Sequence, residues 1–79
     1  MTRRPSRREM NELADDREKC AARCERNAQS GREAAADPTR SATTRRQAAA
    51  AAQSAANHAR EYREEAAALR EGRIPGEDW

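Results

Sequence analysis

Alanine is the feature that most constrains this chain. Nineteen of the 79 residues are Ala, whereas Leu13, Leu69 and Ile74 are the only Leu or Ile, and Val and Phe are absent. Alanine is the strongest helix former because it loses no side-chain entropy. Each buried methyl contributes only about 0.8 kcal/mol, against an ordering cost of roughly 1.5 kcal/mol per residue. We therefore expect one small helical domain that is marginally stable alone and is stabilised by a partner or by self-association.

Two helices are predicted, within a helical region that covers residues 6–72. Ser6-Arg7-Arg8-Glu9 matches a capping box, which starts the first helix at residue 7. Gly31 either ends this helix, giving bounds of about 7–31, or is tolerated inside a helix that continues to Ala36. Residues 1–5 are expected to be a disordered basic tail.

The second helix is predicted over about 38–71. Asp is a strong N-cap and Pro suits the first helical position, so Asp37-Pro38 is taken as its start. Gly72 is expected to cap its C-terminal end. Residues 73–79 are expected to form a flexible tail, since Gly72, Pro75 and Gly76 oppose helix.

Small and apolar residues recur at helical spacing in both segments. The first stripe is Met10, Leu13, Ala14, Cys20, Ala21, Cys24 and Ala28. The second, with alternating steps of four and three, is Ala48, Ala52, Ala55, Ala59, Tyr62, Ala66 and Leu69. Such stripes predict an all-α, antiparallel two-helix hairpin of coiled-coil type, which dimerisation would convert into a four-helix bundle.

A bend near Asp37 would place residue i opposite about residue 74 − i. Leu13 would then approach Tyr62, and Met10 would sit between Tyr62 and Ala66. Met10, Leu13 and Tyr62 are accordingly the predicted core, the one cluster of bulky side chains. Leu69 would face a residue near Pro5 and remain uncovered.

The C-terminal tail is the predicted partner-binding segment. Trp usually anchors a core or an interface, and Trp79 follows a non-helical stretch that contains Glu77 and Asp78. The predicted binding residues are Leu69, Ile74, Glu77, Asp78 and Trp79. The alternative is that Trp79 folds back onto Leu69 and Tyr62 as a hydrophobic cap.

A long polar helical part followed by a flexible tail ending in Trp79 resembles the scaffold peptides of peptide-aminoacyl-tRNA-ligase pathways, in the pyrroloquinoline (ammosamide-type) branch. The resemblance covers the architecture and the final residue. It implies that tailoring enzymes modify Trp79, which Glu77 and Asp78 would flank, and that the helical part is their recognition leader.

Cys20 and Cys24 stand one helical turn apart and are candidate metal ligands. Tetrahedral zinc needs four ligands, so a full site would require a dimer or His58, expected opposite Asp16. The alternative is that both thiols are small core residues in the seam. A nucleophile–base pair of Cys20 and His58 would lack a shaped pocket, so no catalytic residue and no cofactor are predicted.

The charge of +2 is unevenly distributed. Four arginines lie in residues 1–8 without an acid, and any attraction to nucleic acid would come from this tail, through Arg3, Arg4, Arg7 and Arg8. No segment approaches the roughly 20 apolar residues of a membrane span, and no apolar stretch follows the basic N-terminus, so cytoplasmic localisation is expected.

These observations predict a non-enzymatic helical adaptor or scaffold that presents its C-terminal tail to a protein partner, with homo-oligomerisation expected. The sharper version is a ribosomal precursor peptide whose terminal Trp is modified. Two alternatives remain: a small regulatory hairpin that binds a protein, or nucleic acid through its basic tail, and a dimeric metal-binding protein that uses Cys20 and Cys24.

Overall fold

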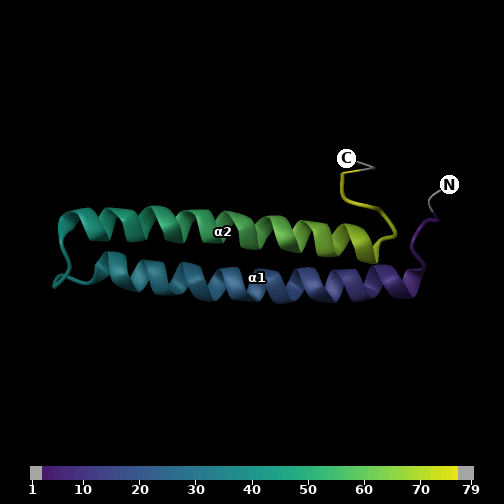
Figure 1. Cartoon of the computed structure of the whole chain (residues 1–79), viewed down its shortest axis with the longest axis horizontal. Helices are drawn as coiled ribbons and strands as arrows, with labels where there is room; N and C mark the ends of the chain where they lie inside the picture. Colours follow the sequence, from purple (N-terminus) through teal and green to yellow (C-terminus); the bar gives the residue numbers. More distant parts are fainter. Residues whose placement is uncertain (1–2, 77–79) are drawn as a thin grey trace.

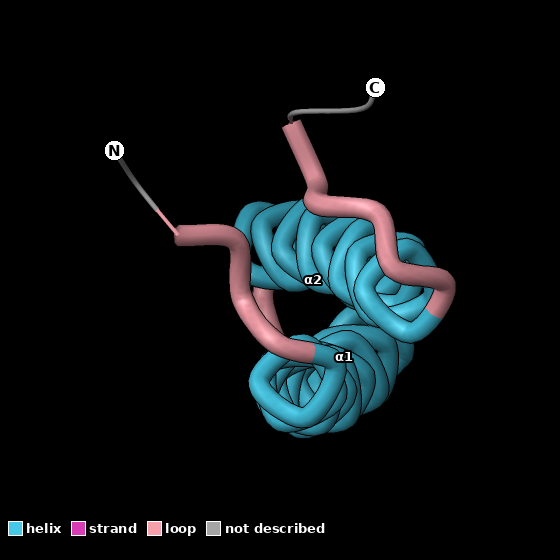
Figure 2. Tube along the Cα trace, turned by 90° about the vertical axis from the view of Figure 1, so that its right-hand side faces the viewer, coloured by secondary structure: helices cyan, strands magenta, loops and turns pink. Residues whose placement is uncertain are grey.

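The computed structural model describes residues 3–76, and these form two helices, α1 (Arg7–Ala36) and α2 (Ala42–Arg70). The helices lie antiparallel and side by side in a rod of 56 × 19 × 18 Å (Figure 1). Both terminal segments leave the same end of the rod, as the end-on view shows (Figure 2). The predicted all-α hairpin is confirmed.

Side-chain and backbone caps define the outer ends of the two helices. The Ser6 hydroxyl accepts the Glu9 N–H at 3.1 Å, and the Glu9 carboxylate accepts the Ser6 N–H at 3.2 Å, so the capping box is formed. At the end of α2, Glu71 is the C-cap and Gly72 follows it with φ 86°. The N–H groups of Gly72 and Arg73 bond the carbonyls of Leu69 and Ala68, which is a Schellman turn.

The turn between the helices differs from the prediction. α1 continues through Gly31 to Ala36, and Asp37 is its C-cap rather than the N-cap of α2. The Asp37 carboxylate accepts the backbone N–H of Thr39 at 2.9 Å and its hydroxyl at 2.7 Å, and Arg40 N–H bonds the Asp37 carbonyl. Asp and Pro favour the first two positions of such a turn as much as a helix start. The N-cap of α2 is Ser41, whose hydroxyl accepts the Thr44 N–H.

The seam between the helices contains an alanine at every seventh residue. In α1 these are Ala14, Ala21 and Ala28, and in α2 they are Ala52, Ala59 and Ala66, all buried. Between them lie the less buried members of the same heptad pattern, among them Arg17, Cys24 and Gly31. A seven-residue repeat of small side chains keeps one face of each helix against the other and permits a close approach of the backbones.

The register of the hairpin also differs from the expected facing rule, because the turn lies further along the chain than Asp37. Arg17 pairs with Glu65 at 2.9 Å, where the rule would place Asn57. Leu69 is consequently not left uncovered, and it is only 5% exposed. It packs with Met10, Ala14 and Ala66 in the one cluster of bulky side chains.

The predicted core of Met10, Leu13 and Tyr62 is therefore corrected. Met10 is buried, but Leu13 is 38% exposed and Tyr62 is half-buried outside the cluster. The shifted register brings Leu69 rather than Tyr62 to the start of α1. Leu13 lies beside the seam instead of in it, since the buried positions run Met10, Ala14 and Ala21.

Gly31 provides a test of the close approach. A Cβ atom built at Gly31 would lie 2.8 Å from the Ala52 Cβ and 3.0 Å from the Ala48 carbonyl oxygen. Alanine gains about 1 kcal/mol of helix propensity over glycine, but overpacking costs typically about 1–3 kcal/mol. We expect Gly31→Ala to lower the thermal midpoint measured by circular dichroism, whereas the exposed neighbour Ser30→Ala should leave it equal or higher. A midpoint raised by Gly31→Ala would contradict the close approach.

Candidate functional site

Two of the five predicted partner-binding residues, Leu69 and Ile74, are not exposed as expected. Leu69 is buried in the core cluster, and Ile74 is half-buried and packs against that cluster. The Schellman turn at Gly72 reverses the chain and returns Ile74 to the end of the hairpin. Glu77, Asp78 and Trp79 lie outside the described residues, so their predicted binding role stays a prediction.

The two cysteines are free and half-buried on the seam side of α1. An Arg23 N–H donates to the Cys20 sulfur at 3.5 Å. Within residues 3–76, no group of three or more His, Cys, Asp or Glu side chains is arranged to hold a metal ion. His58 is exposed, and its expected place opposite Asp16 followed from the incorrect register. A site shared between two copies through Cys20 and Cys24 stays a prediction.

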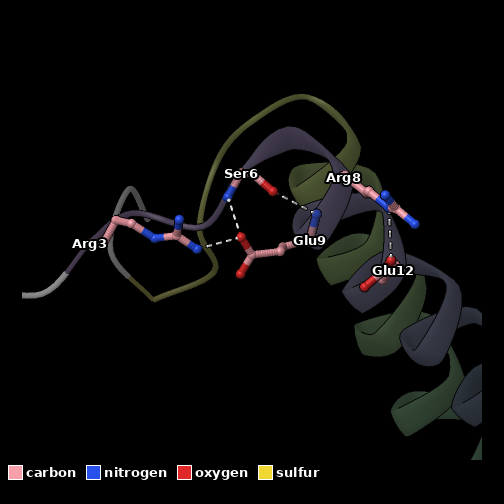
Figure 3. Close-up of polar contacts among 5 residues, drawn as sticks. All are labelled: Arg3, Ser6, Arg8, Glu9 and Glu12. Carbon is pink, nitrogen blue, oxygen red and sulfur yellow. Dashed lines mark hydrogen bonds and ion pairs between the residues drawn. The ribbon is translucent and has the colours of Figure 1, made fainter.

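The basic N-terminal segment makes ion pairs with the first turns of α1 (Figure 3). Arg3 contacts Glu9 at 2.7 Å and Arg8 contacts Glu12 at 3.5 Å. Hydrogen bonding of the Glu9 carboxylate by the Ser6 N–H, then by the Ser6 side chain, and the nearby Arg3 guanidinium hold the pKa of Glu9 below its ordinary value. Arg3 and Arg8 are thus paired with carboxylates of their own chain, although both stay exposed to solvent, as Arg7 does.

A groove runs along one face of the hairpin between α1 and α2. Its main hollow, of about 900 Å³, has a floor that consists of alanines. Two smaller hollows of about 350 and 310 Å³ continue it toward the turn, and adjacent hollows share lining residues. The alanines along this groove are Ala22, Ala28, Ala35, Ala36, Ala42, Ala49, Ala52, Ala56, Ala59 and Ala67. We call this feature the alanine groove.

A second heptad alignment explains the alanine groove. Ala42, Ala49 and Ala56 are seven residues apart on α2, beside the seam. Ala22, Gln29 and Ala36 have the same spacing on the facing flank of α1. Coiled coils usually carry long charged side chains at these flanking positions, which cover the seam. Alanine at the same positions leaves the space between the helices open.

Arginines form most of the rim of the alanine groove, with Glu25 and Glu64 beside them at the main hollow. The arginines are Arg26, Arg32, Arg45, Arg46, Arg60 and Arg63. Within the described part of the chain only Arg63 meets a carboxylate, that of Glu25 at 2.5 Å. Arg32 and Arg60 donate to the side-chain oxygens of Gln29 and Asn57, both at 2.9 Å, and Arg45 donates to the Ala35 carbonyl. Neutral acceptors leave the positive charge of these guanidinium groups uncompensated.

Charge is divided along the length of the rod. Residues 26–60, which form the half that contains the turn, have six arginines and two acids, a net charge of +4. Residues 9–25 and 61–73, which form the other half, have ten acids and six bases, a net charge of −4. The first half is called the loop half below and the second the terminal half. The overall charge of +2 conceals this polarity.

Ion pairs between the helices are concentrated in the terminal half. Arg70 contacts Asp15 at 2.7 Å and Glu18 at 3.0 Å. The hydrogen bonds that Arg70 donates to Glu18 and then to Asp15 raise the pKa of its guanidinium group. The Arg63 hydrogen bond likewise lowers the pKa of Glu25. These pairs fix which turn of α2 lies against which turn of α1.

The chemistry of the alanine groove suits binding. An apolar floor accepts apolar side chains, and arginines on both walls present planar donors that match carboxylates. Arginine stays protonated at any ordinary pH, so the rim supplies charge and hydrogen bonds rather than proton transfer. None of the candidate residues named from the sequence lines this groove.

Comparisons with protein-family models, curated proteins and solved structures found no match to this chain. In the described part of the chain, neither α1 nor α2 combines the length and apolar character that crossing a membrane requires.

Acid pH should destabilise the hairpin. The pKa values of Glu9, Glu25 and Asp37 are lowered, chiefly by hydrogen bonds from the Ser6 N–H, from Arg63 and from the Thr39 hydroxyl respectively. A carboxyl with a lower pKa in the folded state stabilises it above the unfolded value and loses that contribution as pH falls through the folded one. We expect the thermal midpoint to decrease when the pH is lowered below the ordinary carboxyl pKa values of 4.5 for Glu and 3.8 for Asp.

The matched control for this prediction is the triple variant Glu9→Gln/Glu25→Gln/Asp37→Asn. Its thermal midpoint, measured by circular dichroism, should drop less between pH 6 and pH 2 than that of the parent protein. The same drop in both proteins would mean that these three carboxylates do not carry the effect.

Proposed function

We propose that this protein is a non-enzymatic helical scaffold that binds a helix of another polypeptide in the alanine groove. The supporting observation is the coincidence of an open, alanine-floored groove between two packed helices with arginines on both of its walls. Two antiparallel helices with an unfilled flank are the usual platform for a further helix, since helix bundles grow by laying one helix along the groove between two others.

The shape and charge of the groove specify the chemistry of the bound helix. An alanine floor favours a narrow ridge of small or apolar side chains, because only such a ridge approaches closely. The arginines on both walls favour carboxylates on both flanks of that ridge. From Arg46 to Arg63, α2 rises roughly 26 Å, so the bound segment is an amphipathic, acidic helix of about five turns.

The tail-based proposal is retained in a narrower form. Presentation of Glu77, Asp78 and Trp79 to a partner, including modification of Trp79 in a precursor peptide, is compatible with a hairpin that serves as the recognised body. The burial of Leu69 and the packing of Ile74 take both residues out of the exposed segment. Nucleic-acid binding through the N-terminal arginines is the less favoured alternative, since Arg3 and Arg8 already contact Glu9 and Glu12.

Two adjacent alanines test the groove. Ala49 lines the alanine groove, whereas its exposed neighbour Ala50 does not. The probe is a fluorescein-labelled acidic amphipathic peptide of about 18 residues, with an Ala/Leu ridge flanked by Glu. We expect Ala49→Glu to weaken its binding at least tenfold in fluorescence anisotropy, because a carboxylate would occupy the floor and repel the flanking Glu. Ala50→Glu should bind as the parent protein does.

A peptide with Lys in place of Glu is the charge control and should not bind. Failure of the acidic peptide to bind, or equal binding by the Ala49→Glu and Ala50→Glu variants, would contradict the proposed function.

A further inference from the structure

The alanine groove extends into the terminal half, so its face has two electrically different parts. Glu25 lines the main hollow, and Glu18 lies seven residues before it on α1. Asp15 lies seven residues before Ala22, which also lines that hollow. Seven residues are close to two turns, so these carboxylates project from the same face as the groove. Arg63 and Arg70 pair with these three acids, and Glu64 adds a fourth, so four acids stand against two arginines on this part of the face. The face is therefore basic near the turn and keeps a net negative charge near the termini.

We infer that the helices docked in the alanine groove are those of a second copy of this chain, packed antiparallel so that each loop half covers the terminal half of its partner. This inference rests on the proposed function, for which it names the occupant. The acidic helical surface that the basic loop half requires is present on the same face of the molecule. A parallel arrangement would instead place arginines against arginines, at a cost of like-charge repulsion.

A twofold axis makes this arrangement a closed dimer, to which no further copy is added through the same face. Two copies related by a twofold axis use the same face, so that the basic half of each meets the acidic half of the other. Both complementary contacts form at once, and the product is an antiparallel four-helix bundle. Small residues at the flanking positions, such as Ala49 and Ala56, allow the two hairpins to approach as closely as α1 and α2 do within one chain.

The available surface is large enough for a stable dimer. The hairpin measures 56 × 19 Å along one face, a planar footprint of roughly 1,000 Å² per copy, which is comparable with the about 800 Å² that each partner buries in a standard interface. Association would stabilise the monomer, because the core of its described part contains only nine buried residues and seven of these are alanine. Docking would bury Ala22, Ala42, Ala49, Ala56 and Ala67, which line the groove.

Charge reversal of the full-length chain tests this inference. The basic-half variant is Arg32→Glu/Arg46→Glu, whose arginines donate hydrogen bonds to Gln29 and Thr43 of their own helices. The acidic-half variant is Asp15→Lys/Glu64→Lys, which leaves Glu18 to hold Arg70. By sedimentation equilibrium we expect the parent chain to have twice its 8.8 kDa mass, each variant to dissociate at least tenfold more readily, and an equimolar mixture to regain the dimer.

Orientation is tested separately by a spin label at Arg40→Cys in a Cys20→Ser/Cys24→Ser background, since Arg40 lies in the turn. An antiparallel dimer separates the two labels by tens of ångströms, because the turns lie at opposite ends of a rod 56 Å long. A separation within about two helix diameters would mean a parallel pair and would overturn the inference.

The remaining outcomes separate this inference from the proposed function. A parent chain that is monomeric up to millimolar concentration would overturn the second copy as occupant. Loss of acidic-peptide binding in Ala49→Glu alone would then still support helix docking by another polypeptide. A dimer that persists equally in Ala49→Glu and Ala50→Glu would use another face and would also overturn the inference. Circular dichroism of each variant, with helicity unchanged from the parent, confirms that loss of the dimer is not loss of fold.

Discussion

The close approach of two alanine-lined helices is the constraint on which the rest of this structure depends. The chain has too few bulky apolar residues for a conventional core, and most of its buried side chains are single methyl groups. A methyl contributes usefully only when the opposite backbone is near enough to contact it, because dispersion decays steeply with distance. Gly31 against Ala48 and Ala52 marks the limit of this approach.

A seam of identical small residues does not specify its own register. Alanines recur every seven residues on both helices, so a slip of one heptad would bring equivalent methyl groups together. The contacts of Arg70 with Asp15 and Glu18, of Arg63 with Glu25 and of Arg17 with Glu65 distinguish the native register. Each exposed pair is worth little, but a slipped register would lose all of these pairs together with the packing of Leu69 on Met10 and of Gly31 on Ala52.

The sequence patterns correctly predicted the features that depend on a single helix. The stripe of α2 and the Ser6 capping box were read correctly, because periodicity and capping are local properties. The predicted position of the turn was wrong because Asp37-Pro38 is compatible with both a turn and a helix start. The predicted partners of Leu13, Leu69 and His58 on the facing helix were wrong for the same reason. The groove was missed because it arises between helices, although the seven-residue spacing of Ala42, Ala49 and Ala56 and the arginine-rich stretch 26–60 were visible signals.

The ion pairs that set the register also determine which arginines are available for other molecules. In the terminal half, Arg63 and Arg70 are held by carboxylates of the opposite helix, and their charge is consumed internally. In the loop half, Arg26, Arg32, Arg46 and Arg60 have no such carboxylate within the described chain, and the acids that would neutralise them are absent from the sequence between residues 41 and 60. The net positive charge of that half attracts carboxylates of other molecules. Because an alanine floor accommodates a helix and arginine walls attract carboxylates, the two features favour the same kind of occupant, which is the one proposed above.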